Sequence, residues 1–166
     1  MWVAQYFHFN RPGQLITSGG FGTMGFGLGA AMGAKIGNPG KVVVHATGDG
    51  SFRMNCNELA TVQHYGLPII TVLFNNQTLG MVRQWQELFY DRRYSFTELA
   101  NPDFGLIARG NGIAYRCVER RGELAEAIAE MQACRGAYLL EVRVESEDNV
   151  FPMVPAGAPV AAIRLE

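Results

Sequence analysis

Two stretches of the sequence decide the fold. Residues 41–52 read KVVVHATGDGSF, and residues 69–76 read IITVLFNN. Each begins with a run of β-branched and apolar residues, which is typical of a strand buried on both faces of a parallel sheet. Between them, apolar residues recur at every third position from Leu59, which predicts a helix over residues 57–65. A strand, a helix and a second strand form one βαβ unit, so we expect an α/β fold.

The remaining predicted elements continue this alternation. We expect strands at residues 15–17, 114–118 and 138–144, and helices at residues 103–109 and 122–134. Strands that alternate with helices indicate a parallel sheet with helices on both faces. The chain contains no internal repeat and no low-complexity linker, and its 166 residues suit one domain better than two.

Composition excludes several classes of protein. The chain carries 14 basic and 15 acidic residues, a formal net charge of −1, which argues against a general nucleic-acid binder. Its three cysteines form no CxxC pair, so neither a disulfide framework nor a thiolate zinc site is indicated, and we expect a cytoplasmic location. No apolar run reaches the roughly 18 residues of a membrane span, and the first residues do not resemble a signal peptide, so we expect no membrane partner.

Glycine accounts for 20 of the 166 residues and is concentrated before residue 38. Residues 20–25, GFGTMG, match the dinucleotide-binding pattern GxGxxG, but the acidic residue that should follow for the ribose is absent, because the first acidic residue of the chain is Asp49. The dinucleotide interpretation is therefore the weaker one. A loop at residues 19–25 that is free of carboxylates favours close approach of the backbone to an anionic ligand.

A glycine stripe follows this loop. Glycine recurs at every fourth position, at Gly25, Gly29, Gly33 and Gly37. This spacing places the glycines on one face of a helix. We expect another helix or strand to pack closely against Gly29–Gly37, because that face has no side chains.

Polar residues follow both strands of the βαβ unit. Asp49, between two glycines, follows the first strand, and Asn75 and Asn76 follow the second. Parallel strands deliver their carboxyl ends to one edge of the sheet, where open α/β sheets bind ligands. Carboxylate and amide oxygens suit Mg²⁺, and the glycines beside Asp49 are expected to leave backbone N–H groups open to a phosphate. Each group alone would be no more than a surface turn, and the three histidines show no zinc-ligand spacing.

These motifs resemble those of thiamine-diphosphate enzymes, in which GDG and a later NN bind the metal and the diphosphate. The wider resemblance is to the C-terminal cofactor domain of the acetolactate synthase large subunit. It rests on segments spread over the chain: MW and AQ at the start, TSGG with GTMG at 17–25, GMV with QWQ at 80–86, LFY at 88–90, NPDF at 101–104 and PMV at 152–154. It implies a single thiamine-diphosphate and Mg²⁺ domain over residues 1–166, part of a longer enzyme.

The resemblance implies roles for individual residues. The Asp49 and Asn76 side chains and the Thr78 main-chain oxygen would bind Mg²⁺, and Gly50 and Ser51 would hold diphosphate oxygens. The main-chain oxygen of Gly22 would accept a hydrogen bond from the aminopyrimidine. Met24 would act as the wedge that bends the cofactor, and Leu79, Gly80 and Met81 would close over the diphosphate. Met81 and Trp85 would form the wall of the substrate channel.

For the reaction, the resemblance implies condensation of two 2-keto acids with loss of CO₂, with pyruvate and 2-ketobutyrate as substrates. The family takes its catalytic glutamate from an N-terminal pyrimidine-binding domain across a dimer interface, and its FAD lies in a middle domain. This chain of 166 residues has room for neither, so no catalytic residue is assigned and the chain alone is expected to be inactive. A homodimer or tetramer is expected, with a regulatory small subunit as a further partner.

Three alternatives remain open from the sequence. Another thiamine-dependent decarboxylase or carboligase would share the cofactor motifs, and a non-catalytic nucleotide-binding module would share the glycine loop. Met81, Trp85 and Leu88 lie at helical spacing, so they also fit an ordinary core. Arg83, Arg92 and Arg93 fit a solvated helix face better than a substrate clamp.

Overall fold

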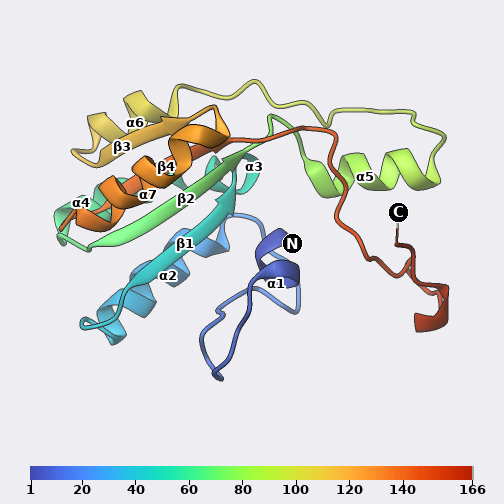
Figure 1. Cartoon of the computed structure of the whole chain (residues 1–166), viewed down its shortest axis with the longest axis horizontal. Helices are drawn as coiled ribbons and strands as arrows, with labels where there is room; N and C mark the ends of the chain where they lie inside the picture. The colour runs from blue at the N-terminus through green and yellow to red at the C-terminus, as the bar shows by residue number, and fades with distance from the viewer. Residues whose placement is uncertain (166) are drawn as a thin grey trace.

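The computed structural model describes residues 1–165, and its centre is a four-stranded parallel sheet (Figure 1). The strands lie in the order β1-β2-β4-β3, with bounds Val43–Gly48 for β1, Ile69–Asn75 for β2, Ala114–Val118 for β3 and Tyr138–Arg143 for β4. Every neighbouring pair is parallel. The strands predicted at the start of the stretches 41–52 and 69–76, and those at 114–118 and 138–144, are therefore confirmed, with no end shifted by more than two residues.

Helices precede or connect the strands. Their bounds are α1 Trp2–Tyr6, α2 Phe26–Gly37, α3 Asp49–Phe52, α4 Leu59–His64, α5 Gly80–Phe89, α6 Phe104–Gly110 and α7 Leu124–Ala133, with short 3₁₀ turns at Cys56–Glu58, Arg121–Glu123 and Val160–Ala162. Asp103 starts α6 by accepting a hydrogen bond from the Leu106 N–H at 2.8 Å, a typical N-cap. The predicted helices at 57–65, 103–109 and 122–134 are confirmed.

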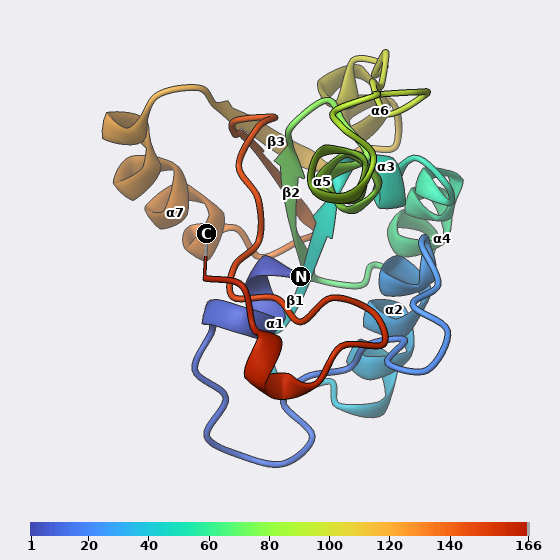
Figure 2. The same ribbon diagram turned by 90° about the vertical axis from the view of Figure 1, so that its right-hand side faces the viewer.

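Helices lie on both sides of the sheet (Figure 2), and one apolar cluster packs against each face. The larger cluster joins α2, α3, α4 and α6 to one face, with Leu73 and Leu139 fully buried at its centre. The smaller cluster joins α7 to β3 and β4 through Ala127 and Leu140. Successive strand residues point to opposite faces, so neighbours such as Leu139 and Leu140 serve different clusters. The expected helices on both faces are confirmed.

The second face of the sheet is covered over only half of its width. α7 lies over β3 and β4, whereas the β1 side chains on that face are exposed: Val44 has 54% of its surface accessible and Val42, just before the strand, has 79%. On β2, Ile70, Val72 and Phe74 share this face and are half-buried. We call these residues of β1 and β2 the outer face.

The expectation of close packing along the glycine stripe is wrong for Gly29, Gly33 and Gly37. No atom lies within 4 Å of the position that a Cβ would take at any of them. The reason is the rotation of α2, which turns Leu28, Ala31 and Lys35 toward the sheet and the stripe away from it. Close approach occurs one position before Leu28, at Gly27, where a Cβ would lie 2.5 Å from the His45 ring nitrogen Nε2.

The predicted strand at residues 15–17 is also wrong. The segment is irregular, and Leu15 and Ile16 are exposed, with 42% and 57% of their surfaces accessible. A strand needs a neighbour with which to exchange backbone hydrogen bonds. Within the described residues, β1 lies at the edge of the sheet and pairs only with β2.

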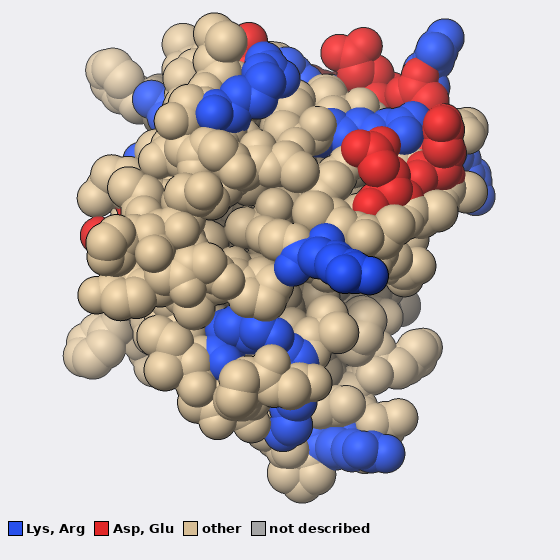
Figure 3. Space-filling model, turned by 90° about the vertical axis from the view of Figure 1, so that its left-hand side faces the viewer, with Lys and Arg blue, Asp and Glu red and all other residues tan. Residues whose placement is uncertain are grey.

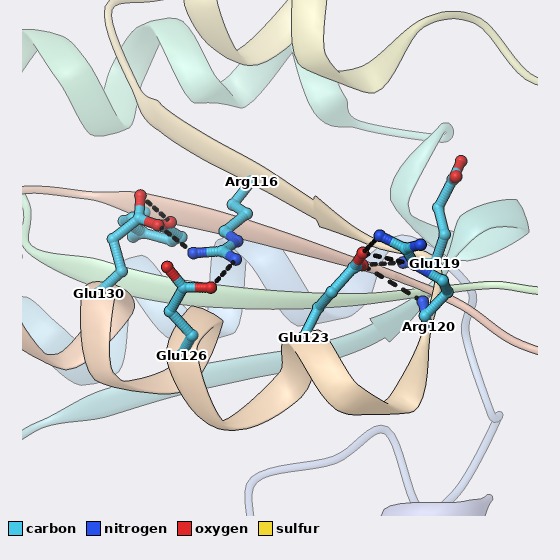
Figure 4. A network of polar contacts seen from close by, with 7 residues as sticks. Arg116, Glu119, Arg120, Glu123, Glu126 and Glu130 are labelled. Carbon is cyan, nitrogen blue, oxygen red and sulfur yellow. Dashed lines mark hydrogen bonds and ion pairs between the residues drawn. The ribbon is translucent and has the colours of Figure 1, made fainter.

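Ion pairs attach α7 to β3 along its solvent side (Figure 4). Arg116 of β3 contacts Glu126 and Glu130 of α7, each at 2.8 Å, and Arg120 contacts Glu123 at 2.6 Å. These pairs hold the pKa values of the Glu123 and Glu130 carboxyl groups below their usual range, through hydrogen bonds to Arg120 and Arg116 respectively. The three carboxylates and the two guanidinium groups lie at the surface, so salt screens their attraction and the core carries the packing of α7.

The C-terminal segment runs back along α5, at the end of the molecule away from α4 (Figures 1 and 2). Gln84 is the buried residue of α5: its side chain accepts a hydrogen bond from the Val150 N–H at 2.9 Å and donates one to the Val150 carbonyl at 3.0 Å. Arg83 adds an ion pair with Glu147 at 3.3 Å. The two segments therefore form one unit beside the carboxyl ends of the strands.

Charge is unevenly distributed over the surface. On the face in Figure 3, acidic side chains gather in one corner, while the part that Figure 1 assigns to α2 shows basic and uncharged residues. This agrees with the absence of any acidic residue before Asp49. Within residues 1–165, no helix is both long and apolar enough to cross a bilayer.

Candidate functional site

Asp49 lies at the centre of the predicted site, directly after β1. It is the first residue of α3, and only 1% of its surface is exposed. One carboxylate oxygen, Oδ1, accepts a hydrogen bond from the Gly50 N–H at 3.0 Å. The other, Oδ2, accepts hydrogen bonds from the Gln77 N–H at 2.9 Å and from the Asn101 side-chain amide at 2.6 Å.

Within the described residues, the Asp49 carboxylate has no cationic partner. Among residues 1–165, no Lys, Arg or His nitrogen lies within 4.0 Å of it. A buried charge is normally paired with an opposite charge or bound to a metal ion. The residues at this position therefore fit a divalent cation such as Mg²⁺, which takes few protein ligands and accepts carboxylate, amide and carbonyl oxygens.

The turn after β2 comes to Asp49, as the topology predicts. Gln77, which donates to Asp49, follows Asn76 and has a left-handed backbone with φ of 57°. The Asn76 side-chain oxygen accepts a hydrogen bond from the Thr78 N–H at 3.2 Å, and the buried Thr78 hydroxyl donates to the Thr97 carbonyl at 2.9 Å. Asp49, Asn76 and Thr78 thus occupy one corner of the sheet, and none of them is displaced from the predicted site.

The Gly50 N–H, which the sequence predicts to face a phosphate, donates to Asp49 Oδ1 in this structure. What the glycine provides is space. A Cβ there would lie 2.9 Å from Leu79 Cδ2 and 3.4 Å from Met24 Cε. Met24, Gly50 and Leu79, three of the residues expected at the cofactor, therefore converge on one point although they come from three different segments.

Ser51 ties the glycine loop to the site. Its hydroxyl oxygen accepts a hydrogen bond from the Gly25 N–H at 2.9 Å, which leaves the hydroxyl proton available for a ligand. Asn55 donates to the Gly25 carbonyl and fixes the same residue from the other side. Gly22 adopts a φ of 63° that glycine favours, and its N–H donates to the Ser18 carbonyl at 2.8 Å. The loop at residues 19–25 is therefore attached to α3 at its end.

Gly80, Met81 and Trp85 lie on α5, which extends from the site. A Cβ at Gly80 would lie 3.2 Å from the Asn76 side-chain nitrogen, so α5 begins in contact with the turn after β2. Met81 and Trp85 share a face of α5, with the Trp85 indole N–H 3.1 Å from the Met81 sulfur. They line an open groove of about 660 Å³ together with Val82, Gln86, Tyr90 and Arg93. The core interpretation fails for Met81, which has 42% of its surface exposed.

Sequence reasoning left three polar residues of this region without a role: Asn75, Asn101 and Glu141. Asn101 lies in the segment NPDF and Asn75 precedes Asn76, but no sequence pattern assigns either of them a role. Glu141 is 2% exposed on β4, and the signal for it was a single carboxylate within the apolar stretch YLLEV. Its Oε2 accepts a hydrogen bond from the Tyr115 hydroxyl at 2.6 Å. Burial, followed by this hydrogen bond, raises the pKa of Tyr115.

Comparison with known proteins adds independent information. Residues 1–142 match the family model described as thiamine pyrophosphate enzyme, C-terminal TPP binding domain. The chain is 49% identical over 159 residues to the acetolactate synthase isozyme 2 large subunit of Escherichia coli K12, covering 95% of this chain and 29% of that protein. It is 45% identical over 157 residues to the mitochondrial acetolactate synthase of Schizosaccharomyces pombe, covering 95% of this chain and 24% of that protein.

Among solved structures, a thiamine diphosphate-dependent 4-hydroxybenzoylformate decarboxylase of Rhodococcus jostii RHA1 matches with a TM-score of 0.68 and 28% identity. The match covers 74% of this chain and 23% of that one. The chain therefore spans less than a third of the length of each of these proteins.

Proposed function

The chain belongs to the thiamine pyrophosphate enzymes, as their C-terminal TPP-binding domain, and from this premise we propose that it is the cofactor domain of an acetolactate synthase. The proposed reaction is the condensation of two 2-keto acids, pyruvate with pyruvate or 2-ketobutyrate, with loss of CO₂. Similarity to acetolactate synthases over 95% of the chain supports this choice of reaction.

One observation carries the proposal for the cofactor: the buried Asp49 carboxylate, which has no cationic partner among residues 1–165, lies against the turn that carries Asn76 and Thr78. In our proposal the Asp49 and Asn76 side chains and the Thr78 carbonyl bind Mg²⁺. The ion in turn neutralises the diphosphate. Ser51 donates its free hydroxyl proton to a diphosphate oxygen, because its own oxygen is already engaged by Gly25.

Thiamine diphosphate, when bound, supplies an electron sink for decarboxylation. The protein positions the reactants and excludes water. Met24 stands against Gly50 and is placed to support a bent cofactor, and Leu79, Gly80 and Met81 are placed to cover its diphosphate end. The Gly22 carbonyl is proposed to accept a hydrogen bond from the aminopyrimidine.

We extend the proposal to the assembly. The catalytic glutamate and the pyrimidine-binding half of the site would come from a separate domain of a neighbouring subunit, so the 166 residues alone should be inactive. FAD would bind outside this chain, and a regulatory small subunit and a cytoplasmic location belong to the same proposal.

The first test replaces Asp49 with Asn in the full-length gene product. Mg²⁺ with thiamine diphosphate at a hundredfold excess over Kd should stabilise the wild type by about 2.7 kcal/mol relative to Mg²⁺ alone. The variant should lose at least roughly 100-fold in cofactor affinity, because the ion loses its charged protein ligand. Thermal unfolding and titration calorimetry measure both quantities.

Asp103→Asn is the matched control, because Asp103 also begins a helix but is not part of the site. It should retain cofactor affinity. Equal affinity in Asp49→Asn and the wild type would refute the metal assignment. For the reaction, acetolactate from pyruvate supports the proposal, whereas release of acetaldehyde alone would favour a decarboxylase related to the Rhodococcus protein.

The second test concerns Trp85. Trp85→Leu should change the preference between pyruvate and 2-ketobutyrate as second substrate by about tenfold, because it reshapes the wall of the groove on α5. Cofactor affinity should stay nearly constant. Competition between the two keto acids, followed by product analysis, measures the preference. A loss of folding in the variant would instead indicate that Trp85 is a core residue.

A further inference from the structure

Glu141 and Asn75 are buried polar residues on neighbouring strands, and the proposed function uses neither. Both are 2% exposed, and both point to the face of the sheet that carries α3 and α6. In the register of β2 and β4, Leu73 lies opposite Glu141 and Asn75 lies opposite Arg143, so the two side chains meet diagonally. The Asn75 amide nitrogen donates a hydrogen bond to Glu141 Oε1 at 2.7 Å.

This hydrogen bond determines which end of the Asn75 amide points toward the metal site. With its nitrogen on Glu141, the amide directs its oxygen to the Asn101 side-chain nitrogen at 3.0 Å and to the Gln77 N–H at 3.3 Å. These two donors are the ones that also hold Asp49 Oδ2, at 2.6 Å and 2.9 Å. Asn75 Oδ1 and Asp49 Oδ2 therefore accept hydrogen bonds from the same two donors, Gln77 N–H and the Asn101 amide.

The opposite orientation of Asn75 would break this arrangement. An inverted amide would place its NH₂ group against the Asn101 NH₂ and the Gln77 N–H, donor against donor. An ionised carboxylate only accepts hydrogen bonds, so Glu141 excludes the inverted amide. Glu141 is itself held in place by the Tyr115 hydroxyl at 2.6 Å and by Arg143 Nε at 3.1 Å.

We propose that Glu141 is a positioning residue of the cofactor site, which acts through Asn75 to hold Asp49 and the turn at residues 76–78 in the geometry that binds Mg²⁺. The inference rests on the proposed function, since it assumes that this corner binds the ion. Within residues 1–165, Glu141 makes no direct hydrogen bond to Asp49 or Asn76, so its effect on them passes through Asn75.

The test compares Glu141→Ala with Glu141→Gln in the full-length gene product. The probe is Mg²⁺ with thiamine diphosphate. Glu141→Ala should lower the affinity about 10- to 100-fold, as expected when a group that orients a metal ligand is removed. Glu141→Gln should stay within about threefold of the wild type, because its side-chain oxygen still accepts from Asn75. Titration calorimetry measures both affinities.

A second readout needs no cofactor. In the cofactor-free protein, hydrogen exchange at the Gln77 amide should accelerate about tenfold or more in Glu141→Ala and stay unchanged in Glu141→Gln, because that N–H donates to both Asn75 and Asp49. If the wild type binds no cofactor, the proposed function fails, and this exchange rate still tests the positioning role. Wild-type affinity and exchange in Glu141→Ala would overturn the inference.

Two milder variants apply if Glu141→Ala does not fold. Tyr115→Phe removes one support of Glu141 and should lower the affinity about two- to threefold. Tyr138→Phe is the matched control: it also removes a hydroxyl that donates to a glutamate, here Glu130 at 2.8 Å on α7, which packs on the opposite face of the sheet. It should leave the affinity unchanged. Equal affinity in both tyrosine variants would count against the proposal.

Discussion

His45 shows how burial changes the chemistry of a single residue. It lies on β1 with 5% of its surface exposed, between the backbone of Gly27 and the ring of Phe52, and its Nδ1 lies 3.5 Å from the Thr71 hydroxyl. Burial lowers its pKa from 6.5 to about 4. The folded protein therefore holds the imidazole neutral at a pH where the unfolded chain has already bound a proton.

The consequence is a pH-dependent free energy of unfolding. Because the pKa is lower in the folded state, stability should be lost as the pH falls from about 6.5 to about 4, by about 3 kcal/mol in total. Urea unfolding at a series of pH values measures this. His45→Gln, which cannot titrate, should show a smaller slope over this range, and an unchanged slope would contradict the assignment.

Only some residues of the candidate site could be predicted from the sequence. Asp49 and Asn76 stand out in the sequence because glycines and a second asparagine surround them, and each directly follows a strand. Glu141 and Asn101 do not, because their roles depend on which strands are neighbours and on how a distant loop returns. The order β1-β2-β4-β3, which places Glu141 beside Asn75, is a property of the sheet and not of any local pattern.

At the scale of elements, α2 shows why periodicity alone does not identify the buried face. The glycine stripe and the row of Leu28, Ala31 and Lys35 are both regular, and only the second faces the sheet. A stripe without side chains permits close packing but does not cause it, whereas removing the apolar Leu28 and Ala31 side chains from water lowers the free energy of the folded chain. Element type was predictable for α2, and its rotation was not.

Two substitutions on α2 separate these roles. Gly29→Ala should stabilise the protein by about 1 kcal/mol, because the site is open and alanine favours helix. Gly27→Ala should destabilise it by about 1–3 kcal/mol, because the new Cβ would lie 2.5 Å from the buried His45 ring. Chemical denaturation measures both values. Stabilisation by Gly27→Ala would mean that the His45 ring can move away without cost.

At the scale of the whole molecule, the buried side chain of Gln84 joins α5 to the C-terminal segment. Gln84 satisfies both the N–H and the carbonyl of Val150, which is buried, so Gln84→Ala would leave two backbone groups without partners. Each such group costs about 1–3 kcal/mol. We expect local opening rather than global unfolding, because residues 149–153 belong to neither apolar cluster of the sheet.

Hydrogen exchange of the Val150 amide measures this opening. It should accelerate at least about tenfold in Gln84→Ala, while amides of β2 keep their wild-type rates. Gln86→Ala, also on α5, is the control, since its side chain contacts Ser95 and not Val150. Acceleration in both variants, or in neither, would show that Gln84 is not the link.

The outer face of β1 and β2 affects how mutations should be interpreted. Val42 and Val44 already meet water in the folded chain, so exchanging either for a polar residue removes little buried surface, and a denaturation curve recorded on these 166 residues would hardly register it. An unchanged free energy of unfolding would therefore apply only to these 166 residues on their own. A stability screen of this chain would therefore not detect a role that Val42 or Val44 has in contacts outside it.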